Sequence, residues 1–463
     1  MEARIAELEA KLAKLEGQLA KHSGNSSKPP SSDGYRRGGK KPAPKSLRRK
    51  RGRRPGGQPG HTGRTLEPSS HPDSVERHAV THCAHCKAEL SDTPVETVVS
   101  RQVWDVPEPQ PVQVTEHQAE KKRCPHCRKP TRAAFPAGAV APVQYGARIR
   151  ALAVYLHSYQ LLPLSRSCEA LWDLTGVSIS EGTLAALVQR TSEALERHMQ
   201  VLRAQVTQAA VGHFDESGCR VSASLWWLHV ASTEQVTCYA VHPKRGREAL
   251  DDIGILPAFT GRAIHDCWQP YQRYTQCAHG LCNAHLLREL VFVHEQLGQA
   301  WARAMGACLV RIKRCVDTAR ATGRALATQT RLWLTKRYQR ILAAGFADNP
   351  LPTSSPDAPK SRGRPKKSKP RNLLERLDLR RDQVLAFFEH PDVPFDNNLA
   401  ERDVRMVKVQ QKVSGTFRSE QGAQAFCRLR SVLSTGRKRG LGALEVLSRL
   451  EDAQLFALPE TTT

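Results

Sequence analysis

Apolar residues in the first 22 positions recur at alternating spacings of three and four, among residues rich in Glu and Lys. These apolar residues are Ile5, Leu8, Leu12, Leu15 and Leu19. The spacing places them on one seam of a helix, which is typical of a coiled coil. Because the run covers only about three heptads, an amphipathic helix that packs on its own chain is the alternative. We expect a coiled-coil helix over residues 1–22.

A helical period also runs through residues 146–200, with an interruption at Thr175-Gly176-Val177-Ser178. Ser180 is a suitable N-cap for the second helix. The apolar face of that helix carries Leu184, Leu187, Val188 and Leu195. Two helices around a Gly-containing turn are compatible with a DNA-binding helix-turn-helix, although such pairs also occur in ordinary cores. We therefore expect a helical segment over residues 136–204.

The pattern changes to strands after residue 205. An apolar run from Ala209 ends in Asp215, and two more strand-like runs follow at 224–231 and 236–241. A helical stretch comes next, and then a short strand that ends in Asp266. Three strands, a helix and a fourth strand is the order of a ribonuclease H-like fold, whose first and fourth strands are neighbours.

Amphipathic helical runs at 300–345 predict a helical insertion over about 287–390 within this domain. The expected fold is therefore a multidomain α/β chain. It has a coiled-coil helix, a linker, a zinc-binding domain, a helical segment, a ribonuclease H-like core with an insertion, and a C-terminal helical segment. The expected boundaries are 1–22, 23–74, 75–135, 136–204, 205–413 and 414–463.

Composition narrows the class of protein. The chain has 463 residues and 40% hydrophobic residues, which excludes a wholly disordered chain. No apolar run approaches the ~18 residues of a membrane span, and no signal-peptide core is present, so we expect a soluble protein of a reducing compartment such as the cytoplasm. Lys and Arg number 70 against 45 acids, a net charge of +25. This surplus predicts a polyanionic partner, with nucleic acid as the leading candidate.

Two segments concentrate the positive charge. Residues 36–54 contain eleven Lys or Arg and no acid, within a Ser-, Pro- and Gly-rich linker over 23–74. Residues 349–372 contain six Pro and seven Lys or Arg, and Arg362-Gly-Arg364-Pro resembles an AT-hook core. A flexible basic linker is the simpler interpretation of both segments. The candidate DNA contacts here are Arg48, Arg49, Lys50, Arg51, Arg53, Arg54, Arg362 and Arg364.

Four of the 13 cysteines form two Cys-x-x-Cys pairs, Cys83/Cys86 and Cys124/Cys127, with 37 residues between them. Four thiolates suit a closed, structural Zn²⁺ site, whereas a redox motif would need only one pair. Alternating valines between the pairs (Val98, Val103, Val106, Val112 and Val114) predict a strand pair that carries the turns. His82, His85 and His126 are nearby alternative ligands, or surface histidines.

Carboxylates at the ends of the first and fourth predicted strands form a candidate catalytic site. Asp215 and Asp266 would face one another and bind Mg²⁺ or Mn²⁺, with Glu216 as a competitor for a metal position. His265 and His285 could lie near this site, although we favour a packed core histidine in each case.

A third acid is expected from a helix that Asp396 or Asn397 caps. On this helix Glu401 lies beside an apolar stripe, together with basic residues that suit phosphate. The stripe is Ala400, Val404 and Val407, and the basic residues are Arg402, Arg405 and Lys408. A surface pair between Glu401 and Arg405 is the simpler interpretation. Further DNA contacts are expected from Arg428, Arg430, Arg437, Lys438 and Arg439 in the last helices.

Taken together, these segments resemble the large transposase of the insertion sequence 66 family over most of the chain. The resemblance includes the leucine-rich helix, the two Cys pairs and the following motifs: Asn25-Ser-Ser-Lys-Pro-Pro-Ser-Ser-Asp33, Arg54-Pro-Gly-Gly-Gln-Pro-Gly-His61, His265-Asp266-Cys-Trp268, Cys282-Asn-Ala-His285-Leu-Leu-Arg288, Asp396-Asn-Asn-Leu-Ala-Glu401-Arg402 and Lys412-Val-Ser-Gly-Thr-Phe-Arg-Ser419.

The resemblance implies a transposase whose catalytic triad is Asp215, Asp266 and Glu401. It implies metal-dependent cleavage at element ends, followed by attack of the freed 3′-hydroxyl on target DNA. The partners would be DNA, a second copy of the chain and accessory proteins of the same element, in the bacterial nucleoid. Two alternatives stay open: a zinc-knuckle DNA-binding protein with an inactive ribonuclease H-like core, and a structure-selective nuclease of the same fold.

Overall fold

The computed structural model describes residues 12, 15–16, 68–105, 112–351, 367–452 and 454–457. It divides the chain into two compact units, one of Ala43–Val112 and one of Met1–Pro42 with Gln113–Thr463. No helix among the described residues is both long and apolar enough to cross a bilayer. Of the predicted coiled coil, only Leu12, Leu15 and Glu16 are described, and they are helical and exposed. The candidate DNA contacts of residues 48–54 and 362–364 lie outside the described residues.

The predicted strand pair between the cysteine pairs is wrong for the residues described there. Val98, Val103, Val112 and Val114 are exposed and belong to no strand. An alternating pattern forms a strand only where something covers its apolar side, and the described part of the chain leaves these valines uncovered. The observed hairpin instead surrounds the second pair: β1 (Lys121–Arg123) runs antiparallel to β2 (Pro130–Arg132).

The helical segment forms where the sequence predicts it. Gly176, with φ of 70°, ends the helix α3, and the Ser180 side chain accepts the N–H of Thr183 at the start of α4. Leu184, Leu187 and Val188 are buried on α4 as expected. The elements are α2 (Ala147–Val154), a π-helical turn (Tyr155–Tyr159), α3 (Leu164–Thr175), α4 (Glu181–Ala194) and α5 (Glu196–Thr207).

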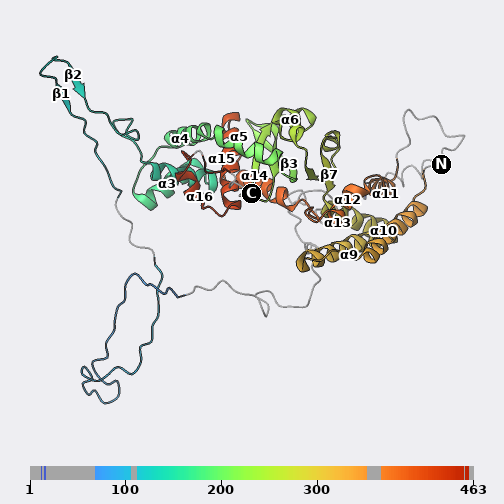
Figure 1. Cartoon of the computed structure of the whole chain (residues 1–463), viewed down its shortest axis with the longest axis horizontal. Helices are drawn as coiled ribbons and strands as arrows, with labels where there is room; N and C mark the ends of the chain where they lie inside the picture. Colours follow the sequence, from blue (N-terminus) through green and yellow to red (C-terminus); the bar gives the residue numbers. More distant parts are fainter. Residues whose placement is uncertain are drawn as a thin grey trace. The chain divides into compact units, whose positions relative to one another are not determined.

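A five-stranded sheet with the order β5-β4-β3-β6-β7 forms the centre of the larger unit (Figure 1). The pairs β3/β4 and β4/β5 are antiparallel, whereas β3/β6 and β6/β7 are parallel. The first and fourth strands of the predicted order, β3 and β6, are therefore neighbours as expected. The strands are β3 (Val211–Val221), β4 (Ser224–Ser232), β5 (Thr237–His242), β6 (Arg262–His265) and β7 (Ala278–Leu281).

The two faces of this sheet belong to separate hydrophobic cores. On one face Phe214, Ala231 and Cys238 pack in a core with residues of α5, α6 and α7. On the other face Cys219, Val230 and Tyr239 share a core with residues of α14 and α15. The covering helices are α6 (Arg247–Ile253), α7 (Ile255–Ala258), α14 (Asn398–Val413), α15 (Glu420–Lys438) and α16 (Ala443–Ser448), and a short 3₁₀ helix spans Gln269–Arg273.

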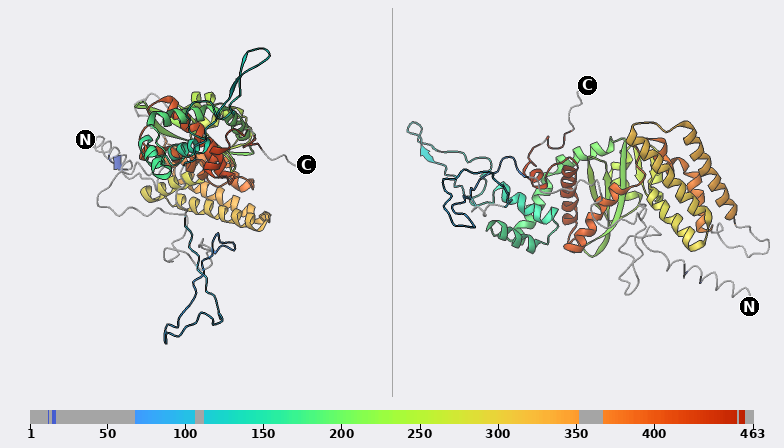
Figure 2. Two further views of the ribbon diagram at one scale, coloured as in Figure 1. Left: turned by 90° about the vertical axis from the view of Figure 1, so that its left-hand side faces the viewer. Right: turned by 90° about the horizontal axis from the view of Figure 1, so that it is seen from below.

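The described residues between β7 and α14 form six helices, which confirms the helical run that the sequence predicts at 300–345. The long helices α9 and α10 lie side by side, as the yellow and orange ribbons of Figure 2 show. Their apolar faces share a core with Ile264 and Leu281 of the sheet. The helices are α8 (Asn283–Leu297), α9 (Ala300–Thr322), α10 (Thr328–Asp348), α11 (Lys369–Leu379), α12 (Arg381–Val384) and α13 (Ala386–Glu389).

A half-buried ion pair fixes α14 to the sheet. Lys438 Nζ on α15 lies 3.0 Å from Asp403 Oδ2 on α14, and both side chains are less than one-fifth exposed. Ser232 and Thr237, from β4 and β5, donate hydroxyl hydrogen bonds to the same Asp403 oxygen at 2.6 and 3.0 Å. One carboxylate therefore joins two strands and two helices.

Removing this carboxylate is predicted to destabilise the fold strongly. Asp403→Ala leaves the Lys438 ammonium buried without a counter-charge, which costs about 3–5 kcal/mol of unfolding free energy. The matched control is Asp317→Ala, because Asp317 pairs with Lys313 on an exposed helix face, where such pairs contribute about 0.3–0.5 kcal/mol. Urea unfolding measures both. Equal effects of the two substitutions would contradict the role given to Asp403.

Candidate active site

The parallel pairing of β3 and β6 brings Asp215 and Asp266 to the same level. His213 of β3 is opposite Ile264 of β6. Two residues further along each parallel strand come Asp215 and Asp266, so the register carries both acids to one end of the sheet. Asp266 also accepts the backbone N–H of Trp268 at 2.9 Å, which orients its carboxylate. The structure thus brings together the two acids that the sequence analysis pairs.

Strand alternation separates Asp215 from its neighbour Glu216. Side chains on β3 point alternately to the two faces, so Asp215 shares a face with Cys219 and Glu216 shares one with Phe214. Cys219 belongs to the core that contains residues of α14, and Phe214 belongs to the opposite core. Asp215 therefore faces α14, whereas Glu216 faces Tyr271.

Glu401 lies in the first turn of α14, whose buried stripe is Ala400, Val404 and Val407 as expected. Asn397 occupies the N-cap position, but its side chain does not cap the helix. It bonds instead to the His213 ring at 2.9 Å and to the Phe214 carbonyl at 2.8 Å, both on β3. Asn397 is therefore a tether between α14 and the strand that carries Asp215, whereas Asp396, the other predicted cap, accepts the N–H of Asn398 at the start of α14 at 3.1 Å.

The charges of the three acids act on one another. Burial raises the pKa of Asp215 well above its usual range, and the negative charges of Glu216, Glu401 and Asp266 raise it further. For Glu401, a hydrogen bond from His285 is the main cause of a lowered pKa, and Arg288 and Arg405 also contribute. The charges of Glu216, Glu401 and Asp266 therefore all act on Asp215.

Glu216 is held by other groups. Its side chain is 2% exposed, and Arg245 Nη2 lies 2.6 Å from its Oε1. Tyr271 donates its hydroxyl to the other oxygen at 2.5 Å. The Arg245 guanidinium in turn stacks 4.8 Å from the ring centre of Trp227 and 4.2 Å from that of Trp268. Glu216, the competitor for a metal position, is thus already neutralised by an arginine between two tryptophans.

Removing that arginine is predicted to destabilise the protein. Arg245→Met leaves the Glu216 carboxylate buried and unpaired, at a cost of about 3 kcal/mol in unfolding free energy. Arg247→Met is the control, because Arg247 pairs with Asp251 on an exposed helix surface, where a loss of at most ~0.5 kcal/mol is expected. Chemical denaturation distinguishes the two. A loss below ~1 kcal/mol for Arg245→Met would show that Glu216 does not depend on it.

The two candidate histidines differ. His265 is fully buried, stacks on Tyr271 with ring centres 4.6 Å apart, and hydrogen-bonds to His279 at 3.0 Å, so it is the core histidine we expected. His285 is not a core histidine, because its Nε2 lies 3.3 Å from Glu401 Oε1. Cys282, which the sequence analysis did not assign to the site, lies 3.7 Å from the same oxygen. The signal that could have identified both residues is their Cys-x-x-His spacing.

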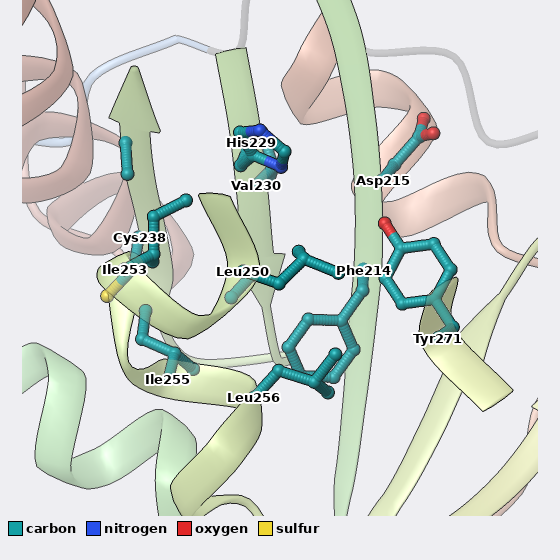
Figure 3. Close-up of a pocket in the computed structure, with 12 residues that line it drawn as sticks. Phe214, Asp215, His229, Val230, Cys238, Leu250, Ile253, Ile255, Leu256 and Tyr271 are labelled. Atoms are coloured by element: carbon teal, nitrogen blue, oxygen red, sulfur yellow. The ribbon is translucent and has the colours of Figure 1, made fainter. Parts of the chain in front are cut away.

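An apolar cavity lies on the other side of β3, and Figure 3 shows the Asp215 carboxylate turned away from it. Its walls are largely aliphatic and aromatic, from Phe214, Leu250, Ile255 and Leu256. Burial lowers the pKa of His229, which also lines it, to about 4. An uncharged histidine among apolar walls belongs to the core.

The predicted cations near the site behave differently. Arg402 and Arg405 are exposed, and Arg405 lies 3.9 Å from Glu401. Lys408 is half-buried and donates to the Gly218 carbonyl. Three cations of the last helices do not face solvent. Arg430 bonds to the Tyr159 carbonyl, Lys438 to Asp403, and Arg439 to the Phe456 carbonyl and Gln205.

DNA contact by those three is therefore a wrong prediction. Lys438 is paired with Asp403, and the guanidinium groups of Arg430 and Arg439 bond to backbone carbonyls and Gln205 of the fold, so these side chains are directed inward. Arg428 is paired with Glu196 at 3.4 Å, and Arg437 is exposed.

Each cysteine pair forms the same local turn. The Lys87 N–H donates to the Cys83 carbonyl at 3.0 Å, and the Arg128 N–H donates to the Cys124 carbonyl at 2.9 Å. Lys87 and Arg128 both have positive φ, 62° and 56°. Backbone N–H groups of the turn, from Cys86 and His85 in the first pair and Cys127 and His126 in the second, lower the pKa of the Cys83 and Cys124 thiols. Zinc binds the thiolate form of cysteine, so a lowered thiol pKa favours zinc binding.

Comparison with known proteins first indicates the class. Residues 81–128, which contain both cysteine pairs, match the zinc-finger binding domain of transposase IS66, and residues 1–67 match a family of unknown function (DUF6444). Residues 142–425, which include the sheet, the insertion and all three acids, match the Transposase IS66 family. Because this match covers more than half of the chain, the protein belongs to the IS66 transposase family.

A curated relative is similar over a shorter segment. It is the "Uncharacterized protein y4jO" of Sinorhizobium fredii (strain NBRC 101917 / NGR234), 36% identical over 69 residues. The aligned segment covers 15% of this chain and 22% of the relative. The chain thus spans about a fifth of the length of that relative.

Proposed function

We propose that the protein is a DNA transposase that cleaves the ends of its insertion sequence and joins them to target DNA. The observation that carries the proposal is the parallel register of β3 and β6, which carries Asp215 and Asp266 to the same level. The charge of Glu401 on α14, which acts on Asp215, adds support. These three residues lie inside the segment that matches the transposase family. Acids that are spread along the chain and gathered at one end of a sheet are the arrangement expected of a phosphoryl-transfer site.

The core is, in our proposal, ribonuclease H-like. Its support is the strand order β5-β4-β3-β6-β7, with three antiparallel strands followed by two strands parallel to β3. We propose accordingly that the ribonuclease H-like domain spans residues 205–413 and that its insertion spans about 287–390. The N-terminal coiled coil is proposed on the sequence pattern alone.

The donor set at the three acids fits Mg²⁺ or Mn²⁺, which prefer carboxylate oxygens. Burial raises the pKa of Asp215, the negative charges of Glu216, Glu401 and Asp266 raise it further, and a divalent cation among the carboxylates would offset these effects. Asp215 and Asp266 would share one ion, and Glu401 would complete a second site. When bound, the metal would activate the attacking oxygen and stabilise the negative charge that develops on the oxygens around phosphorus.

The protein's own groups supply orientation. Asn397 holds the start of α14 to β3, and Asp403 fixes the same helix from its other side, so Glu401 is positioned between two anchors. Exposed Arg402 and Arg405 next to Glu401 would bind the phosphates of the DNA strand. Arg245 keeps the Glu216 charge away from the cations of the site.

Substitution of each acid by its amide is predicted to abolish both reactions. Asp215→Asn, Asp266→Asn and Glu401→Gln remove a metal-binding charge without changing side-chain size. We expect end cleavage and strand transfer to fall by roughly 10²-fold or more, the scale at which loss of one charge-stabilising group acts. The assay uses DNA bounded by the element's terminal repeats, with Mg²⁺ and a supercoiled target.

Glu248→Gln is the matched control, because Glu248 is an exposed acid on α6, and it should retain full activity. Circular dichroism checks that each variant is folded. Full activity in a folded Asp215→Asn or Glu401→Gln protein would overturn the triad. Absence of cleavage by the unmodified protein would favour a DNA-binding protein with an inactive core, and cleavage without joining would favour a nuclease.

We also propose that Cys83, Cys86, Cys124 and Cys127 bind one structural Zn²⁺. Support comes from the zinc-finger match over residues 81–128 and from the two identical turns with stabilised thiolates. Four thiolates leave no open coordination position, so this zinc folds the domain and does not catalyse. The domain would present basic residues to DNA, together with the basic segments outside the described residues.

Loss of one ligand from each pair is predicted to remove this zinc. Cys83→Ser and Cys124→Ser should each lower the zinc content by one ion per chain, because a three-thiolate site binds zinc far more weakly. Cys168→Ser is the control, since Cys168 is a single, half-buried cysteine of α3. Elemental analysis of purified protein gives the content. Unchanged zinc in both knuckle variants would contradict the assignment.

The remaining partners follow from the reaction. Transposition acts on both ends of an element, so we propose a complex of two or more copies of the protein with DNA. Accessory proteins of the same element are proposed as further partners. The protein would act on DNA in the cytoplasm, at the nucleoid.

A further inference from the structure

Cys282, His285 and Glu401 converge on one point beside the proposed triad. Each offers one metal-binding atom, and the three atoms lie within 4.8 Å of one another. The Cys282 sulfur is 3.7 Å and the His285 Nε2 is 3.3 Å from the same Glu401 oxygen. Neither Cys282 nor His285 has a part in the Mg²⁺ chemistry proposed above.

The chemistry of these donors differs from that of the triad. A thiolate, an imidazole and a carboxylate are the ligands of Zn²⁺, Co²⁺ and Cd²⁺, whereas Mg²⁺ avoids sulfur. Cys282 and His285 are three residues apart, a short spacing of the kind found in zinc sites. Three protein ligands leave a tetrahedral ion one open position.

The backbone around the cysteine is arranged to hold a sulfur ligand. Cys282 lies between β7 and α8, where its own N–H donates to the His265 carbonyl at 2.9 Å. The Asn397 N–H donates to the Cys282 sulfur at 3.2 Å. This N–H bond favours the thiolate, whereas burial and the charge of Glu401 raise the pKa of the Cys282 thiol to about 12, so the proton leaves only when a metal replaces it. His285 and Glu401 are 21% and 17% exposed, so an ion can enter from their side.

We propose that Cys282, His285 and Glu401 form a site for a thiophilic divalent cation such as Zn²⁺, and that this ion competes with Mg²⁺ for Glu401. Binding exchanges the thiol proton for the metal, so one proton is released for each ion bound. A Glu401 carboxylate bound to zinc beside a thiolate is withdrawn from the triad. The inhibitory part of this inference rests on the proposed function, whereas the binding part does not.

Cobalt measures binding directly. Full-length protein that already carries its knuckle zinc is titrated with Co²⁺, whose thiolate complexes absorb visible light. The wild type should bind one Co²⁺ with thiolate-to-metal absorption, and Cys282→Ser should lose that absorption. His285→Gln, at a partly exposed position, should weaken binding by at least ~10-fold. Cys308→Ala is the matched control, since Cys308 is a buried cysteine within α9, and it should behave as the wild type.

A wild type that binds no more Co²⁺ than Cys282→Ser would overturn the site. His285→Gln keeps the test decisive if Cys282→Ser does not fold, because undiminished cobalt absorption in that variant would also overturn it. Loss of the cobalt absorption in both Cys282→Ser and His285→Gln would support the proposed site. A purely structural contact between Cys282 and Glu401 produces no such absorption.

Competition is measured by DNA cleavage in Mg²⁺ with added Zn²⁺. Zinc should inhibit the wild type, and Cys282→Ser should need at least ~10-fold more zinc for the same inhibition. Equal sensitivity of the two proteins would contradict competition at Glu401. Cobalt binding by a protein that never cleaves DNA would support the metal site and overturn the proposed function, so the two failures are distinguishable.

Discussion

The ion pair between Asp403 and Lys438 is the interaction on which the arrangement of the site depends. A carboxylate and an ammonium with little access to water must stay together, because either alone would be a buried, uncompensated charge. Ser232 and Thr237 use the same carboxylate, so the pair fixes the rotation and height of α14 against β4 and β5. Glu401 lies half a turn before Asp403 on this helix, and its position follows from that of its neighbour.

Two periodicities then determine which acids meet. The helical period turns Glu401 toward β3, whereas Asp403 faces α15. The strand period of two directs the Asp215 side chain to the α14 side of the sheet and the Glu216 side chain to the opposite side. The parallel register of β3 and β6 adds Asp266 at the same level. The protein thus places two adjacent acids in opposite roles. Asp215 stays among carboxylates, and Glu216 is neutralised by Arg245 and Tyr271.

Much of this could be predicted from the sequence, because local periodicity carries it. The adjacency of β3 and β6, the Ser180 cap and the buried stripe of Ala400, Val404 and Val407 follow from spacing alone. The inward direction of Lys438, Arg430 and Arg439 could not be predicted in this way. The residue type shows that the side chain is charged, but it does not show which distant group the side chain bonds to. The same holds for Asn397, whose side chain bonds to β3 instead of capping α14. The prediction of strands from the alternating valines was wrong because an alternating pattern forms no strand without a surface that covers its apolar side.

The long helical insertion between β7 and α14 also determines when the site can exist. Asp215 and Asp266 leave the ribosome early, but Glu401 follows only after α8 to α13 have been synthesised, and Lys438 of α15 is translated later still. A nascent chain therefore carries two of the three acids for much of its synthesis without the third. Interrupted translation or proteolysis before α15 leaves α14 without its anchor. Products that end before α14 would carry Asp215 and Asp266 without Glu401, and products that end between α14 and α15 would carry all three acids without the pair between Asp403 and Lys438.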